Sequence, residues 1–438
     1  MKISSLSTEQ APPISVPLRF FTAAPLFLLL AALMLVSGAD NPFADMHSPA
    51  LLAATHCITL GFMAMIMMGA MQQILPVVIG SPMPASRLTA WLTFLPLISG
   101  ALLLPAGFML GKPVLFNLAW PLLGLAFITF ISASLISLAR APAHNATRTA
   151  ILLSILALGG AVALGMLLAH GYATGSLLPY TMLATAHISL SLGGWVLLLI
   201  VGVSYQVVPM FQLTPNYPKW LANGLAPAIF IALLSSLLPL LLEPMPHWLV
   251  IVAQSLVWLL AGYFAVTTLM LQSKRRRHVA DATLSFFRLG MMSLLCAALL
   301  YLATLFFPAN ERLGTLYAEL FLLGFAMSLM HGMLYKIVPF LVWFHLFRGG
   351  VKSGVPNMKE IIPETWMWRH LWLHRSTLLG ALFAPWWNAA AWLVEVGLLL
   401  QGMLLGYALF IAIAVYRRTL ERIGTDCNLN IPDSADQL

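Results

Sequence analysis

Histidine is the residue type in this chain that is best suited to bind a redox cofactor. His56 and His187 lie within long apolar segments, and His47 and His170 lie near the ends of such segments. Imidazole nitrogens bind haem iron, copper and zinc. We therefore take His56 and His187 as candidate ligands of haem or copper, with His170 and His47 as candidate further ligands. The alternative is that these side chains hydrogen-bond to neighbouring helices or lie at the level of lipid headgroups.

Four other polar side chains occur in apolar segments, namely Tyr317, Glu319, His331 and Lys336. A charge at the centre of a membrane helix costs about 2.5–3.5 kcal/mol, so each such residue suggests a function. His331 could bind haem, relay protons together with Lys336, or simply hydrogen-bond to a backbone carbonyl.

Two further patterns have the spacing of one helical face. His370 and His374 are four residues apart, as a metal-binding pair would require. Tryptophan and arginine surround them, so the sequence favours a segment at the membrane interface. Met63, Met67 and Met71 could pass Cu(I) along a helix, or they could pack against neighbouring helices.

The composition requires a membrane around these residues. The chain is 61% hydrophobic and only 8% charged, whereas soluble domains carry about 25% charged residues. Segments of about 20 apolar residues can cross a bilayer as helices. The expected spans are 18–38, 50–79, 88–110, 114–139, 149–170, 178–211, 221–242, 248–272, 282–307, 313–346, 366–386 and 389–416. The segment 366–386 is the least apolar, and without it the chain would have eleven spans.

The distribution of charge gives the orientation. Basic residues are concentrated in alternate loops, and only Lys112 and Arg312 fall in loops on the other side. Because cytoplasmic loops are enriched in Lys and Arg, both termini are expected in the cytoplasm, with the chain in a bacterial inner (cytoplasmic) membrane. The net charge of +8 thus reflects topology, and no nucleic-acid partner is expected. The expected parts are a cytoplasmic tail 1–17, one transmembrane domain 18–418 and a cytoplasmic tail 419–438.

One pattern occurs three times in the chain at intervals of about 130 residues. It consists of a glycine and an aromatic residue, then a second glycine, Gln or Lys, two aliphatic residues and a proline. The three copies begin at Gly61, Gly194 and Gly324. Each interval holds four expected spans, which predicts an all-α protein of about twelve helices in three repeats, 18–139, 149–272 and 282–416. Glycines eight residues apart lie near one helical face and allow close packing of helices.

This layout resembles subunit I of the haem–copper oxidases, including cytochrome c oxidase, and the large subunit of nitric oxide reductase. The resemblance extends over nearly the whole chain. In detail it depends on His56 before Leu60-Gly61-Phe62 and on Ala186-His187 before Gly193-Gly194-Trp195. A more distant likeness is to the NnrS-type membrane proteins, although the local motif of that family is absent.

The resemblance implies that the histidine of the second helix is an axial haem ligand and that the histidine of the sixth helix binds copper. These roles would fall to His56 and His187. The remaining ligands of that family are missing. Segment 221–242 has no histidine, and Tyr317-Ala318-Glu319 stands where the tenth helix should have a His-x-His pair. The sequence therefore departs from a complete binuclear oxygen-reducing or nitric-oxide-reducing centre.

Two functions remain from this comparison, with a complete terminal oxidase as a weaker third. The first is a membrane redox protein with haem b, and with copper as a second candidate cofactor. It would act in respiratory electron transfer or in handling nitric oxide or oxygen, and a cytochrome or quinol would donate electrons. The alternative is a cofactor-free membrane carrier or assembly factor for copper or haem. If His56, His187, Tyr317 and Glu319 face a common axis between the repeats, they converge at one depth near the outer side.

Overall fold

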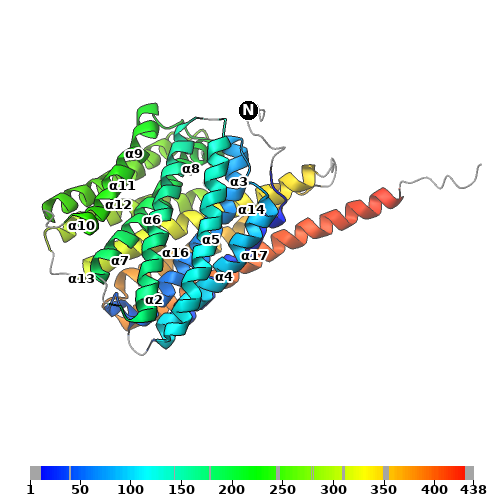
Figure 1. Ribbon diagram of the computed structural model, residues 1–438. Coiled ribbons are helices and arrows are strands. Elements are labelled where there is room, and N and C mark those ends of the chain that lie inside the picture. The colour runs from blue at the N-terminus through cyan, green and yellow to red at the C-terminus, as the bar shows by residue number, and fades with distance from the viewer. Residues whose placement is uncertain are drawn as a thin grey trace, which may run out of the picture.

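The computed structural model describes residues 11–38, 41–142, 144–176, 179–242, 247–277, 279, 281–307, 311–348 and 355–429. These residues form a bundle of long helices, and no strand occurs among them (Figure 1). The last helix leans away from the bundle toward its C-terminal end (Figure 1). Arg417 and Arg418 of this projecting part are exposed. Helix continues to Leu429, so part of the predicted tail 419–438 is helical, and 430–438 lies outside the described residues.

Every segment that the sequence predicts as a span contains helix. The first third of the chain has α1 (Ser15–Val36), η3 (Pro42–Ala44), α2 (Pro49–His56), η4 (Cys57–Ala64), α3 (Met65–Ile74), η5 (Leu75–Ile79), α4 (Ser86–Leu110) and α5 (Pro113–Arg140). The middle third has α6 (Ala146–Thr174), α7 (Tyr180–Ile188), η6 (Ser189–Leu197), α8 (Leu198–Gln212), α9 (Lys219–Leu234), η7 (Ser235–Leu237), α10 (Leu238–Leu241) and α11 (His247–Ser273). The last third has α12 (Ala282–Thr304), α13 (Glu311–Glu319), η8 (Leu320–Met327), α14 (Ser328–Arg348), α15 (Met358–Ile361), α16 (Glu364–Phe383) and α17 (Asn388–Leu429).

Ten helices among the described residues are long and apolar enough to cross a membrane. This finding confirms a multi-pass membrane protein. The segment Lys219–Leu234 is apolar but shorter. The helix α16 is amphipathic, because its buried residues Met367, His370, Leu371 and His374 recur at helical spacing.

Each helix that carries the repeated glycine–aromatic pattern changes its winding at the same point. The π-helical segments η4, η6 and η8 begin at Cys57, Ser189 and Leu320, and each includes the first glycine of the pattern. Wider turns of this kind are uncommon and are frequently found at functional sites.

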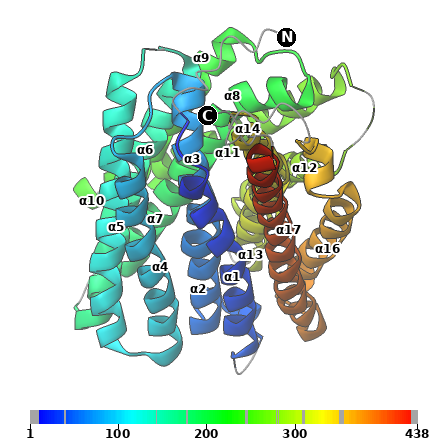
Figure 2. The ribbon, with the colours of Figure 1, turned by 90° about the vertical axis from the view of Figure 1, so that its right-hand side faces the viewer.

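The pattern glycines pack against the first helix of each predicted repeat. A Cβ atom at Gly61 would collide with Phe27 of α1, and one at Gly194 would collide with Ala157 of α6. A Cβ at Gly324 would lie 2.6 Å from Ser293 of α12. These approaches explain why the sequence has glycine there. In the view of Figure 2, α1, α2 and α3 stand beside α4 and α5, and α16 and α17 form the opposite side.

Candidate functional site

His56 is the last residue of α2, directly before the π-helical segment η4. Its Nδ1–H donates to the carbonyl of Leu52, at 2.7 Å, one turn back in the same helix. Its ring stands 5.2 Å from the ring of Phe108 of α4, measured between centroids. Because a carbonyl can only accept, this hydrogen bond places the proton on Nδ1 and leaves a lone pair on Nε2 of the neutral ring.

His187 lies one residue before the end of α7 and is held in the same way by a different helix. Its Nδ1–H donates to the carbonyl of Ala161 in α6, at 2.8 Å. The ring lies over Gly165, where a Cβ would be 2.8 Å from the ring carbon Cε1. The neutral His187 ring therefore also presents an unprotonated Nε2.

Both rings are half-buried, on helices that pack against different neighbours, α2 against α1 and α4, and α7 against α6. His187 has an electrostatic influence on His56, and no hydrogen bond or ring contact joins the two among the described interactions.

His47 and His170 do not join this pair in any described interaction. The side chain of His47 is 81% exposed and lies 3.6 Å from the Asp45 carboxylate in the turn before α2. His170 is exposed near the end of α6, and its ring is 6.0 Å from that of Trp120. Neither position supports the prediction that these residues are further ligands.

Tyr317 and Glu319 belong to another part of the bundle. The Tyr317 ring packs against Trp258 of α11 and Tyr301 of α12, with centroids 5.5 and 5.7 Å away. Glu319 is buried, and neither of its carboxylate oxygens has a hydrogen-bond partner. No described interaction joins these residues to His56 or His187.

A second group of histidines lies where α14 meets α16. His331, His370 and His374 are each at most 1% exposed. The ring centroid of His331 is 4.3 Å from that of His370 and 5.1 Å from that of His374. Phe62 and Phe286 cover the His331 ring. We call His331, His370 and His374 the histidine triad.

This burial corrects the sequence-based interpretation of His370 and His374. The interpretation as a membrane-interface segment is wrong for both, because they face the protein interior. Arginine and tryptophan occupy the other faces of α16, where Arg375 stacks on Trp372 at 4.6 Å. Met367, His370, Leu371 and His374 recur at helical spacing in the sequence. This spacing was the signal that could have separated the buried face of α16 from the faces that carry tryptophan and arginine.

Hydrogen bonds fix two of the three rings. Gln401 of α17 donates from its amide nitrogen to Thr377 at 2.9 Å, so its oxygen accepts from Nδ1–H of His374 at 2.8 Å. Nε2 of His374 lies 2.8 Å from the Ser328 hydroxyl. Nδ1 of His370 lies 2.8 Å from the hydroxyl of Tyr335.

The remaining ring nitrogens have no hydrogen-bond partner. These are both nitrogens of His331 and Nε2 of His370. An unsatisfied buried polar group costs about 1–3 kcal/mol, so three of them side by side require an explanation. As they stand, no three His, Cys, Asp or Glu side chains in the described part of the chain are placed to hold a metal ion.

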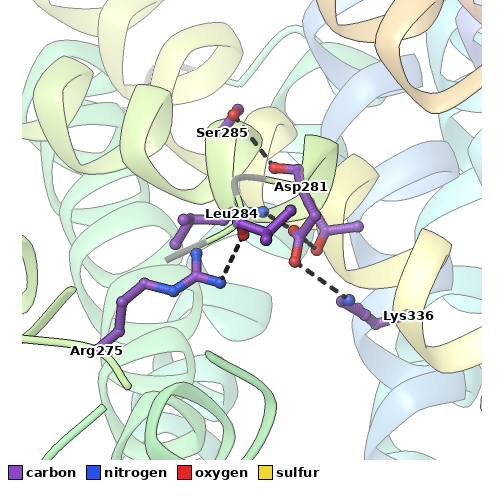
Figure 3. Close-up of polar contacts among 7 residues, drawn as sticks. Arg275, Asp281, Leu284, Ser285 and Lys336 are labelled. Carbon is purple, nitrogen blue, oxygen red and sulfur yellow. Dashed lines mark hydrogen bonds and ion pairs between the residues drawn. The ribbon is translucent and has the colours of Figure 1, made fainter. Parts of the chain in front are cut away.

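Lys336 follows Tyr335 in α14, on another side of the helix. Its Nζ is 3.7 Å from the Asp281 carboxylate, as Figure 3 shows. Asp281 also caps the beginning of α12 by accepting from the backbone N–H of Leu284 at 2.8 Å. Lys336 is therefore level with the beginning of α12, at the side where the predicted cytoplasmic loop lies. Arg275 of that loop donates to the carbonyl of Val279.

The electrostatics of Asp281 follow from these contacts. Burial acts to raise the pKa of the Asp281 carboxyl, but the Leu284 N–H, the Lys336 ammonium and the Thr283 hydroxyl outweigh it. The pKa of Asp281 is therefore held below its ordinary value, and the carboxylate stays ionised at neutral pH.

No family model matches this chain, and comparison with curated proteins finds no match. The functional argument therefore depends on the residues and their geometry.

Proposed function

We propose that this chain is a haem-binding membrane redox protein in which His56 and His187 supply the axial nitrogens of a b-type haem. We further propose that the chain resembles subunit I of the haem–copper oxidases and the large subunit of the nitric oxide reductases, and that it lacks the full set of ligands of their binuclear centre. The assigned role is respiratory electron transfer or the handling of nitric oxide or oxygen, with a cytochrome or quinol as electron donor.

One observation carries the proposal. Each of the two histidines donates its Nδ1 proton to a backbone carbonyl, that of Leu52 or that of Ala161. Histidines that bind metals almost always donate their other ring N–H in this way, because the hydrogen bond fixes the tautomer and the orientation of the ring. Two such rings, on the separate helices α2 and α7, supply the two nitrogen donors of a bis-histidine haem.

The surroundings of the pair support an apolar planar cofactor. Phe108 lies beside His56, and its ring is 5.3 Å from that of Tyr172 in α6. Gly165 lets the His187 ring lie close against α6. Haem held by two axial histidines supplies reversible one-electron transfer. In this scheme the protein holds the two imidazoles, keeps both neutral and surrounds them with apolar side chains.

The finer architecture belongs to the same proposal. We infer twelve spans in three repeats of four helices, in a bacterial inner membrane with both termini cytoplasmic. The three π-helical segments at matching positions support the repeats. The two helices Lys219–Leu234 and Glu364–Phe383 would complete the twelve spans.

The test is the haem content of the purified protein and of four variants. The expected result is about one haem b per chain in the wild type, with loss of haem in His56→Ala and in His187→Ala. The variants His47→Ala and His170→Ala serve as matched controls, because neither ring contacts the pair, and both should retain haem. If wild-type protein from haem-sufficient cells is colourless, the redox proposal fails and a carrier or assembly factor for copper or haem takes its place.

A further inference from the structure

Three arginines gather where α11 ends and α12 begins. Arg275 and Arg277 follow the end of α11, and Arg288 lies in the second turn of α12. The charges of Arg277 and Arg288 both repel that of Arg275. The Nη2 atom of Arg288 lies 3.5 Å from the carbonyl of Gln272, so this side chain extends toward the end of α11. We call Arg275, Arg277 and Arg288 the arginine cluster.

The acid that interacts with the arginine cluster in the described part of the chain is already occupied by other partners. Asp281 accepts from the Leu284 N–H and the Thr283 hydroxyl, and its carboxylate lies 3.7 Å from the Lys336 ammonium. Figure 3 shows Arg275 and Lys336 on either side of Asp281. Arg275 is 7% exposed, and its Nε has no hydrogen-bond partner. Buried charges are normally paired, so the excess of positive charge here calls for an anion.

Hydrogen bonds to α8 hold the loop that carries two of these arginines. The amide nitrogen of Gln272 donates to the side-chain oxygen of Gln212 at 2.9 Å. The backbone N–H of Arg276 donates to the carbonyl of Leu213 at 3.0 Å. Because the backbone is fixed at these points, an anion that binds here has less of the loop to order, and ordering is a main cost of binding.

An exposed apolar face of α12 begins at Arg288. Met292, Cys296 and Leu299 follow Arg288 at intervals of four, four and three residues, which is the spacing of one helical face. Met292 is 57% exposed, Leu299 is 59% exposed and Cys296 is also exposed. At 1.5 Å per residue this face extends for about 16 Å from Arg288 to Leu299. It therefore offers an acyl chain an apolar surface that has a cation at one end.

We propose that the arginine cluster binds the phosphate group of an anionic phospholipid, whose acyl chain lies along the exposed face of α12. Guanidinium groups match phosphate oxygens with paired, charge-assisted hydrogen bonds. The exposed Arg288 and the half-buried Arg277 make these bonds, and the buried Arg275 adds its charge behind them. In the proposed orientation the lipid belongs to the cytoplasmic leaflet, where basic pockets between membrane helices bind anionic headgroups.

The position of the cluster favours a lipid over free phosphate, and an anionic lipid over a zwitterionic one. Free phosphate would use the three charges only, whereas a phospholipid also covers Met292 and Leu299. A zwitterionic headgroup carries its own cation, which would add to the positive excess around Arg275. The site shares no residue with the proposed haem site, and it does not depend on haem binding.

The experiment is native mass spectrometry of the delipidated full-length protein in detergent, titrated with phosphatidylglycerol and with phosphatidylcholine of the same acyl chains. Wild-type protein is expected to bind phosphatidylglycerol more tightly. Arg277→Gln and Arg288→Gln should each weaken phosphatidylglycerol binding about fivefold and leave phosphatidylcholine binding unchanged. Arg288→Lys keeps the charge and should retain most of the preference. The control is Arg140→Gln, which removes an exposed arginine from the end of α5 on the same predicted side.

Two further measurements distinguish the possible causes of a change. Elution volume and melting temperature are recorded for each variant, so that loss of lipid from an intact protein differs from misfolding. Inorganic phosphate is added as a competitor, and at concentrations similar to that of the lipid it should not displace phosphatidylglycerol. A colourless protein can be titrated in the same way, so failure of the haem proposal leaves this test intact.

The proposal is overturned if wild-type protein binds the two lipids equally, or if Arg277→Gln and Arg288→Gln bind phosphatidylglycerol as tightly as wild type does. An equal loss in Arg140→Gln would show that net charge determines binding and would overturn the assignment to this cluster. Displacement of the lipid by equimolar inorganic phosphate would refute the choice of a phospholipid.

Discussion

Gly165 determines how closely His187 can lie against α6. A Cβ at this position would be 2.8 Å from the ring carbon Cε1, so Gly165→Ala should push the ring away from its hydrogen bond with Ala161. We expect a lower haem-to-protein ratio and a loss of stability of about 1–3 kcal/mol. Gly159→Ala is the matched control on the same helix, since a Cβ there would meet nothing within 4 Å. Equal haem content in the two variants would contradict this role.

Tyr335 orients the His370 ring of the histidine triad. Tyr335→Phe removes the hydroxyl that lies 2.8 Å from Nδ1 and keeps the rest of the side chain. Because the buried Nδ1 of His370 then loses its hydrogen bond, we expect a loss of stability of about 1–3 kcal/mol, measured as a lower melting temperature in detergent. The haem spectrum should not change. Tyr317→Phe, which lies in the separate cluster with Trp258, is the control, and an equal loss of stability in the two variants would count against this role of Tyr335.

At the scale of elements, α12 begins at a charged cap whose contribution depends on pH. The pKa of Asp281 is lowered in the folded protein, so its carboxylate stabilises the fold fully above the ordinary value of about 3.9. The stabilisation is lost as the pH falls through the lowered pKa. Asp281→Asn keeps a capping side chain and removes the charge opposite Lys336. Because both side chains are partly exposed, we expect a cost of about 1 kcal/mol or less at neutral pH.

Thermal unfolding in detergent at several pH values measures this difference. The melting temperatures of wild type and Asp281→Asn should approach each other as the pH falls below about 3.9. A gap that stays constant as the pH falls further, through the lowered pKa of Asp281, would show that the charge of Asp281 does not contribute.

The approach of η6 to α6 depends on one of two adjacent glycines. At Gly194 a Cβ would collide with the Cβ of Ala157, which is attached directly to the backbone and cannot move aside. At Gly193 a Cβ would meet only the end of the flexible Leu233 side chain, at 2.8 Å. Gly194→Ala should therefore lower stability by about 1–3 kcal/mol and Gly193→Ala by clearly less. Thermal unfolding of the two variants compares them, and the reverse order would contradict the packing described.

For the whole molecule, sequence patterns were enough to locate the helices. Runs of apolar residues predicted most helix limits to within a few residues, since membrane spans must be long and apolar. The last helix is an exception, because it continues to Leu429, beyond the predicted limit at 416. The repeats placed His56, His187, Tyr317 and Glu319 at one depth, and convergence was expected only if all four faced a common axis. Tyr317 packs against Trp258 and Tyr301, because depth does not determine the direction in which a side chain points.

The histidine triad was beyond the reach of local patterns. His331 and His370 come from different helices, and the intervening segment gives no sign that α16 turns its histidines toward α14. Tryptophan and arginine on the other faces of α16 dominate its composition, so the average character of the segment hid its buried face. Tertiary packing decided the outcome there.

The most direct test of the central claim is the dithionite-reduced minus oxidised visible spectrum of the detergent-purified protein, with haem stoichiometry, for wild type and for His56→Ala. The account predicts the bands of a bis-histidine b-type haem at about one per chain, lost in the variant while the protein remains folded. A colourless wild type from haem-sufficient cells, or an unchanged spectrum in His56→Ala, would contradict it.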